Sequence, residues 1–377
     1  MNALSLFANI GVAEAFLNDV GINVVLANEN IVRRANLYSK IYPETKMICG
    51  NVTQKKIFDL IVSESVQLNI DIVMATPPCQ GMSTAGQQKT DDERNNLIVL
   101  TLDLIGKVSP KYVFIENVPL FLKTYIKYKG KKTLIPDFIK NRLGSKYHIE
   151  FNLVDTKNYS IPQSRQRAIV LLSRKDQNKT WTMPDKNNRL VTMKDAIGNI
   201  PIIDPFVKDI SEAKLLKMFP NFYKRKKKAL KISIWNRPPE HVERQVISMM
   251  YTPTGCSAFD NNKFKPIKEN GDLVKGFQNT YKRQDWDSPA YAVTMDNRKI
   301  SSQDNVHPGR KLKKASGGRY VYSDARALTL YEIMRIMSLP DDWPLPANTS
   351  EAFIRRIIGE GIPPLFVKQV FGNLKNN

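Results

Sequence analysis

Short apolar runs rich in β-branched residues alternate with longer segments of helical spacing through the first 175 residues of the chain. Strands that alternate with helices predict an α/β fold with a parallel, doubly wound sheet. Ligands of such sheets bind beyond the carboxyl ends of the strands. The spacing predicts strands over 3–8, 23–28, 71–76, 112–118, 147–154 and 168–172, and helices over 12–20 and 92–108. Asp91 or Asp92 would cap the second of these helices.

A change of composition marks a second region of the chain. Residues 174–325 are rich in Lys, Asn, Pro and Ser and have weak periodicity, which predicts a smaller, irregular domain. Helical spacing then returns over three segments whose apolar positions are typical of a core. We therefore expect a first domain over 1–173, a second over 174–325, and a C-terminal segment, 326–377, that packs back on the first. The three C-terminal helices are predicted over 327–338, 350–358 and 363–374.

The charge of the chain is unevenly distributed. The sequence has 57 Lys and Arg against 36 Asp and Glu, a formal net charge of +21. By count, residues 171–320 hold 30 Lys and Arg against 15 Asp and Glu, a net +15. Much of this surplus lies in two clusters, 224–228 and 310–314. Either cluster alone would be typical of a solvated surface, but both in one half of the chain, beside Trp, Tyr and Asn, favour a nucleic-acid partner.

Composition also excludes several classes of protein. The chain has 377 residues, of which 42% are hydrophobic, enough for a substantial core. Its 3 Cys form no CxxC pair and its 3 His form no ligand-spaced cluster, so neither a disulfide scaffold nor a metal site is predicted. No stretch approaches about 18 consecutive apolar residues, and the N-terminus has no basic leader. A cytoplasmic protein without a membrane span is expected.

Two residues that carry chemistry follow neighbouring predicted strands. Cys79 lies in the segment TPPCQG, at the end of strand 71–76, and is a candidate nucleophile because a thiolate is highly nucleophilic near neutral pH. Most single Cys residues are instead small buried hydrophobes. Glu116 begins the ENV segment that ends strand 112–118. A carboxyl that is partly shielded there is suited to proton donation, although a structural ion pair is the alternative.

A pair of arginines leads into the last predicted strand of the first domain. Arg165 and Arg167, in the segment QSRQR, are spaced i, i+2 and would point to one face of a strand. They would then present a fixed pair of donors to an oxygen or a phosphate. Alone, RxR is a common surface pattern.

In this order, the PCQ, ENV and QxRxR segments resemble the motifs of the DNA (cytosine-5) methyltransferases, in particular those of bacterial restriction-modification systems. The DxRNxL pattern at 92–97 and the GEGIPP segment at 359–364 are similar to further motifs of that family. The resemblance covers nearly the whole chain apart from 174–325. It implies a Rossmann-like methyltransferase sheet, S-adenosylmethionine as cosubstrate and no metal. It also implies that 174–325 is a target recognition domain that reads bases of double-stranded DNA.

The resemblance implies a catalytic role for four residues. Cys79 would attack C6 of a cytosine that has rotated out of the duplex, while Glu116 would hydrogen-bond or protonate N3. Arg165 and Arg167 would orient the pyrimidine O2 and the cysteine loop. For DNA binding, the loop after Cys79 would contribute Gln80 and Ser83, and a flanking phosphate would be held by Arg94.

The cofactor site that the resemblance implies departs from the family pattern at a few positions. Asn9 stands where the first glycine of the FxGxG motif is expected, and Asn tolerates left-handed backbone better than most residues. Glu360 replaces the usual Asn, Ser160 replaces a Gly, and Asn30 replaces an apolar or aromatic residue. The residues assigned to cofactor binding are Phe7, Ala8, Asn9, Ile10, Gly11, Glu29, Asn30, Asn51, Val52, Pro77, Leu97, Glu360 and Ile362.

Three other functions stay open on the sequence. One is a tRNA cytosine-5 methyltransferase, although the characteristic CFT-type segment of that branch does not occur. Another is a catalytically silent DNA-binding subunit, and a third is a plain nucleotide-binding domain joined to an unrelated basic module. For the favoured function we expect a monomer that binds double-stranded DNA, with a possible cognate restriction endonuclease but no stable complex with it.

Overall fold

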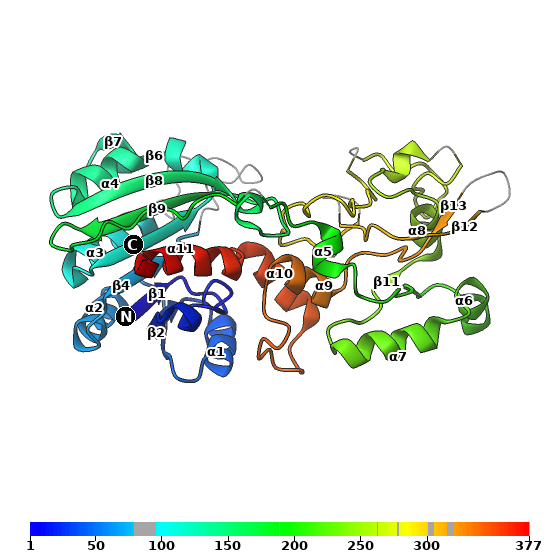
Figure 1. Cartoon of the computed structure of the whole chain (residues 1–377), viewed down its shortest axis with the longest axis horizontal. Coiled ribbons are helices and arrows are strands. Elements are labelled where there is room, and N and C mark those ends of the chain that lie inside the picture. The colour runs from blue at the N-terminus through cyan, green and yellow to red at the C-terminus, as the bar shows by residue number, and fades with distance from the viewer. Residues whose placement is uncertain are drawn as a thin grey trace. The chain divides into compact units, whose positions relative to one another are not determined.

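The chain forms two compact units in the computed structural model (Figure 1), and each is described by itself. The first unit comprises Met1–Tyr159, Arg165–Asn188 and Ile362–Asn377, and the second comprises Ser160–Ser164 and Arg189–Gly361. The structure describes residues 1–78, 96–187, 189–261, 263–276, 279–300, 305–314 and 320–376.

A seven-stranded sheet, in the order β3-β2-β1-β4-β5-β9-β8, forms the centre of the first unit. The first five strands in this order are parallel, and β9 is antiparallel to both of its neighbours. The doubly wound α/β fold is confirmed, but the expectation of a wholly parallel sheet is wrong at β9. The connection from Asp155 to Gln166 is too short for the crossover that a parallel pair requires. The strands are β1 (Asn2–Leu6), β2 (Asn23–Glu29), β3 (Lys46–Cys49), β4 (Ile72–Ala75), β5 (Tyr112–Asn117), β8 (Tyr147–Asp155) and β9 (Gln166–Arg174).

All six predicted strands are present, and two local expectations differ from the structure. The predicted helix over 12–20 is a series of turns that ends in a 3₁₀ helix, Asn18–Val20. Its amides bond three residues back, as Leu17 does to Glu14 at 3.0 Å, which is the period of turns and 3₁₀ helices. Strand β3 was not predicted; it is only four residues long, and one of the four is buried.

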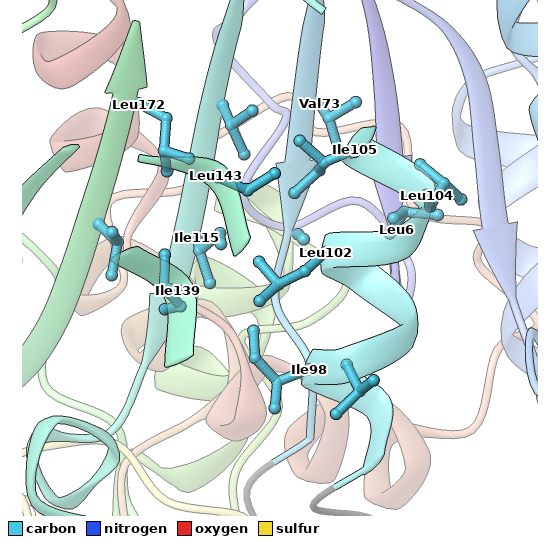
Figure 2. Packing of buried hydrophobic residues seen from close by; sticks show 14 of the residues in the cluster. Leu6, Val73, Ile98, Leu102, Leu104, Ile105, Ile115, Ile139, Leu143 and Leu172 are labelled. Carbon is cyan, nitrogen blue, oxygen red and sulfur yellow. The ribbon is translucent and has the colours of Figure 1, made fainter. Parts of the chain in front are cut away.

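Helices cover both faces of the sheet. Side chains of β1, β4 and β5 pack against α3 and α4 in one large hydrophobic cluster, in which Leu6, Ile105 and Ile139 are almost fully buried (Figure 2). On the other face of β5, the ring of Phe114 lies 5.3 Å from that of Phe371 in α11. The helices of this unit are α1 (Val32–Ile41), α2 (Lys55–Gln67), α3 (Asn96–Val108), α4 (Ile135–Leu143) and α11 (Pro364–Asn376), and β6 (Tyr125–Tyr128) pairs with β7 (Lys131–Leu134) as a separate hairpin.

Short elements and long connections make up the second unit, as its composition predicts. Phe222, Val246 and Val306 belong to its own buried cluster. No helix in the part of the chain that the structure describes is long and apolar enough to cross a membrane. The elements are α5 (Met193–Ile197), α6 (Glu212–Met218), α7 (Phe222–Ile232), α8 (Glu243–Met250), α9 (Leu330–Ile336) and α10 (Glu351–Glu360), with the strand pairs β10 (Phe206–Val207) and β11 (Glu240–His241), and β12 (Lys311–Lys314) and β13 (Tyr320–Tyr322).

The predicted domain boundaries differ from this division of the chain. Residues 326–361 belong to the second unit, whereas the prediction joined them to the first. Hydrogen bonds to earlier parts of the second unit account for this: the buried Arg326 donates to the Ile203 carbonyl at 3.0 Å, and the Asn297 side chain donates to the Arg355 carbonyl at 2.7 Å. Only the segment from residue 362 onward returns to the sheet. Residues 174–187 stay with the first unit, where the indole of Trp181 donates to the carbonyl of Val370 at 2.9 Å.

Candidate active site

The turn after β1 has an unusual backbone. Phe7, Asn9 and Gly11 are all left-handed, with φ of 59°, 54° and 79°. The Gly11 amide donates to the Ala8 carbonyl at 2.9 Å and closes the turn. Asn adopts this conformation more readily than other residues with a Cβ, so Asn9 preserves the turn where a glycine was expected. Ile10 is fully buried, so cofactor contact by this residue stays a prediction.

Gly11 is the position in this turn that leaves no room for a side chain. A Cβ there would lie 2.1 Å from Cε2 of Tyr42, whose hydroxyl donates to the Gly11 carbonyl at 2.6 Å. Left-handed strain and overpacking add, so we expect Gly11→Ala to lower the free energy of unfolding by roughly 2–5 kcal/mol. We also expect it to weaken binding of S-adenosylmethionine. Chemical denaturation and titration calorimetry measure the two effects.

The matched control for this substitution is Gly130→Ala. Gly130 has the same left-handed backbone, with φ of 80°, but a Cβ there would meet nothing within 4 Å. It should lose only the backbone component, about 1–2 kcal/mol, and bind the cofactor normally. Equal losses of stability in the two variants would contradict the role given to Tyr42.

Glu29, at the end of β2, holds the turn in place. Its Oε2 accepts a hydrogen bond from the Asn9 amide at 2.9 Å, and its Oε1 accepts one from the Ile31 amide at 2.8 Å. The side chain is almost buried, with 6% exposed. A carboxylate can accept about four hydrogen bonds, so Glu29 is fixed and still able to accept more. Its neighbour Asn30 is exposed.

The end of β2 is also tied to the segment that follows β3. The buried Asn28 amide donates to the carbonyls of Ile48, at 2.8 Å, and Gly50, at 3.0 Å. The next residue, Asn51, accepts from the Thr53 amide at 3.0 Å through its side chain, which closes a short turn. Three adjacent strand ends therefore form one connected edge. Sequence analysis missed the role of Asn28 in joining these strand ends, although a polar residue at the end of a buried strand was a signal for it.

Two of the predicted cofactor residues contribute mainly to the core. Val52 is 4% exposed and lies in the large hydrophobic cluster, against which Leu97 of α3 also packs. Val52 further borders a surface depression of about 740 Å³ that is lined mainly by residues of α2, α3 and α4. Cofactor contact by these two side chains stays a prediction.

The residues that precede Cys79 connect the two halves of the candidate site. The Thr76 hydroxyl donates to the Phe7 carbonyl at 3.2 Å, on the side of the β1 turn. On the other side, the Asn117 side chain of β5 donates to the Pro77 carbonyl at 3.0 Å. The chain that leads to Cys79 is thus held between the predicted cofactor turn and the strand of Glu116. Cys79, Gln80, Ser83 and Arg94 themselves lie outside the described residues, as does the predicted N-cap of α3.

Glu116 of β5 forms an ion pair with Arg167 of β9. The Nε of Arg167 lies 2.6 Å from Oε1 of Glu116, and both side chains are largely shielded, with 13% and 11% exposed. The pairing follows from the register of β5 and β9, in which Asn117 lies opposite Ala168. A charge-assisted bond of this kind fixes the orientation of the carboxylate. Its location beside the Pro77 tie favours the functional interpretation of Glu116.

The QxRxR segment is divided between the two units. Arg165 is 4% exposed and belongs to the first unit, where its amide donates to Oδ1 of Asp155 at 3.0 Å. Gln163 is fully buried in the second unit and accepts from the Val293 amide at 3.0 Å. Ser160 is left-handed, with φ of 56°, at the position where a glycine was expected. Glu360 ends α10 in the second unit, whereas Ile362 begins the last segment of the first.

A buried polar cluster that sequence analysis did not assign lies beneath the β1 turn. The Tyr38 hydroxyl donates to the Glu14 carboxyl, and the rings of Tyr38 and Tyr42 lie 4.9 Å apart. Burial raises the pKa of Glu14 to about 7, against hydrogen bonds from Ser5 and Tyr38 that lower it. The cluster connects α1 to the turn through Tyr42. An isolated acid within an apolar stretch was the available signal for Glu14.

Taken together, the edge offers a braced turn and a fixed carboxylate on one side, and a shielded acid with its arginine on the other. Among the described residues, no group of three or more His, Cys, Asp or Glu is placed to hold a metal ion. The arrangement suits binding of a nucleotide-like cofactor next to a site for proton transfer.

Comparisons with known proteins agree with this arrangement. The family model of the C-5 cytosine-specific DNA methylases matches residues 1–376. The chain is 41% identical to the type II methyltransferase M1.HgaI of Avibacterium volantium over 378 aligned positions, which cover 99% of this chain and 98% of that protein. Among solved structures, it is similar to a prophage-encoded protein of Escherichia coli described as a DNA modification methyltransferase, with a TM-score of 0.67, 20% identity, and coverage of 100% of this chain and 99% of the other.

A second solved structure, the methyltransferase EhMeth of Entamoeba histolytica, has a TM-score of 0.59 and 17% identity, and the match covers 99% of this chain and 97% of the other. At these identities the two structures show the shared fold. The family match and the 41% identical relative confirm the resemblance noted in the sequence. The chain therefore belongs to the family of C-5 cytosine-specific DNA methylases.

Proposed function

We propose that the chain transfers a methyl group from S-adenosylmethionine to C5 of a cytosine that is rotated out of duplex DNA, at sites chosen by its second unit. The observation that carries the proposal is the bracing of the Cys79 segment between the β1 turn and β5. Thr76 bonds to Phe7 on one side and Pro77 to Asn117 on the other. By analogy with the type II methyltransferase relative, the product would protect host DNA in a restriction-modification system.

The residues at the first three strand ends fit S-adenosylmethionine. Gly11 and Asn9 give a tightly curved turn, and the Glu29 carboxylate beside it can accept ribose hydroxyls. Asn51 supplies a polar side chain at the next strand end. When bound, the cofactor supplies an electrophilic methyl group on a sulfonium centre.

In the proposed reaction, the Cys79 thiolate forms a bond to C6 of the cytosine, and the displaced electron pair moves toward C5 and N3. Glu116, held by Arg167, hydrogen-bonds or protonates N3 and so stabilises the electron-rich ring. C5 in this state is nucleophilic enough to accept the methyl group. Removal of the C5 proton by a base, return of any N3 proton to Glu116 and expulsion of the Cys79 thiolate from C6 restore the aromatic ring. The covalent step divides one difficult reaction into easier ones.

The proposal assigns DNA contacts to both units. Gln80, Ser83 and Arg94 would contact the substrate from the segment after β4, and Arg165 would orient the pyrimidine O2. C6 is inaccessible within a stacked duplex, which is why the base must leave the helix. Specific sequence is read from base edges, which we assign to the basic second unit. A monomer in the cytoplasm, within reach of cellular DNA, completes the proposal.

Bisulfite sequencing tests this function directly. DNA from cells that express the chain should contain C5-methylated cytosines in one recurring sequence context, absent from cells with an empty vector. Methylated tRNA with unmodified DNA would favour the tRNA alternative. If the chain binds DNA but neither DNA nor tRNA becomes methylated, a catalytically silent DNA-binding subunit would be favoured.

A further inference from the structure

Helix α7, Phe222–Ile232 of the second unit, uses only one side to pack (Figure 1). Phe222 and Ala229 are buried, with 2% and 0% exposed, and they face the core of their unit. At the margin of this side, Nη1 of Arg225 lies 2.7 Å from Oδ1 of Asp204. These contacts dock the helix and account for one of the five basic residues in the 224–228 cluster.

The opposite side of α7 carries four exposed lysines, Lys224, Lys227, Lys228 and Lys231, which we call the lysine stripe. They are spaced i, i+3, i+4 and i+7, which places them within an arc of about 100° on the helix. In an ordinary amphipathic helix this spacing belongs to the apolar face. Here it gathers positive charge on one line opposite the buried side.

The lysine stripe is electrostatically unfavourable within its own unit. Like charges at i, i+3 and i, i+4 destabilise a helix, and the stripe contains both kinds of pair. No ion pair among the described residues involves the four lysines. Nearby acids have other partners, since Glu212 accepts from the Tyr223 hydroxyl and Glu243 pairs with Lys214. A polyanion beside the stripe would relieve this repulsion.

We propose that the lysine stripe binds the phosphate backbone of duplex DNA independently of base sequence. The inference rests on the proposed function and adds a contact to it. The seven residue steps from Lys224 to Lys231 rise by about 10 Å along the helix. This matches roughly three phosphates of one DNA strand, measured as the rise of about 3.4 Å per phosphate along the duplex axis. The ammonium groups are compact point charges without the planar fork of arginine, so they suit phosphate positioning better than base reading.

The salt dependence of binding tests the proposal. In one variant all four lysines are replaced by glutamine, which has a similar helix propensity. Because each phosphate contact contributes about 0.9 to the slope of log affinity against log salt, the slope should fall in magnitude by about 3–4, and affinity at low salt by at least about tenfold. The preference for a duplex that contains the recognition sequence over one that lacks it should be retained. Replacement of the four lysines by arginine should restore the slope.

A control variant removes the same charge from the helices of the first unit. It replaces the exposed Lys40, Lys55, Lys56 and Lys107 by glutamine, and its slope should change much less. Circular dichroism verifies that both variants are folded. Equal slopes in the wild type and the stripe variant, or equal losses in the stripe and control variants, would overturn the proposal. The proposal would also be overturned if the stripe variant bound DNA as the wild type does but no longer bound tRNA or polyglutamate. These outcomes are separate from failure of the proposed function, which is the absence of methylated cytosine.

Discussion

Replacement of Cys79 by serine is expected to lower kcat by about 10⁴ to 10⁶-fold, the range for removal of a covalent nucleophile. A serine hydroxyl is not ionised near neutral pH and has no base assigned to it here, so attack on C6 fails. Two measurements report the loss. Transfer of a labelled methyl group to DNA should cease, and DNA that contains 5-fluorocytosine should no longer form a covalent adduct in the presence of S-adenosylmethionine, because elimination requires the C5 proton that fluorine replaces.

The other two cysteines of the chain provide matched controls. Cys49 is exposed on β3, and Cys256 is partly buried in the second unit. Cys256→Ser makes the same chemical change at a cysteine to which no role is assigned and should retain both transfer and trapping. Cys49 lies opposite Glu29 at the end of β3, so Cys49→Ser is compared at saturating cofactor, where it should also retain the adduct. An adduct that survives Cys79→Ser, or that disappears in either control, would remove Cys79 from its role.

Sequence was sufficient to predict which strand ends share the edge of the sheet that carries the candidate site. In a doubly wound fold, parallel strands place their carboxyl ends on one side, so the segments after β1, β2 and β4 were expected to meet. The hydrogen bonds from Asn9 to Glu29 and from Thr76 to Phe7 agree with this expectation. Left-handed backbone at Asn9 and Ser160 also follows from motif positions where glycine was expected.

The partners of the site residues could not be predicted in the same way. Arg167 meets Glu116 only because β9 enters beside β5 in the antiparallel direction, and a parallel β9 would have given another register. Tyr42 braces the β1 turn from a helix, and nothing in its sequence neighbourhood indicates that contact. Likewise, the placement of 326–361 depends on buried hydrogen bonds from Arg326 to Ile203 and from Asn297 to Arg355, which apolar spacing does not report.

The ion pair of Glu116 and Arg167 gives the second large effect. Glu116→Gln retains the shape of the side chain, but its amide can neither take up nor release a proton and it carries no charge for Arg167 to hold, so we expect kcat to fall by about 10² to 10⁴-fold. Affinity for duplex DNA should change little, because the substitution leaves the charges on the protein surface in place. Single-turnover transfer under saturating DNA and cofactor separates this loss from a loss of binding. Arg167→Met should lower kcat as well, since it leaves the carboxylate unoriented.

A double variant distinguishes joint action from two independent contributions. If Arg167 acts only by orienting Glu116, then Arg167→Met should have little further effect in the Glu116→Gln background, and the combined loss should be far from additive. Asp71→Asn is the matched control. Asp71 and Lys111 directly precede the neighbouring strands β4 and β5 and pair at 2.8 Å, at the edge of the sheet opposite to the candidate site. That variant loses a comparable ion pair from the same sheet and should keep its kcat. Proton transfer to the pyrimidine requires a group at the carboxyl edge of the sheet, whereas an ion pair can support the fold at either edge. Equal kcat losses in Glu116→Gln and Asp71→Asn would therefore mean that the Glu116 pair supports only the fold.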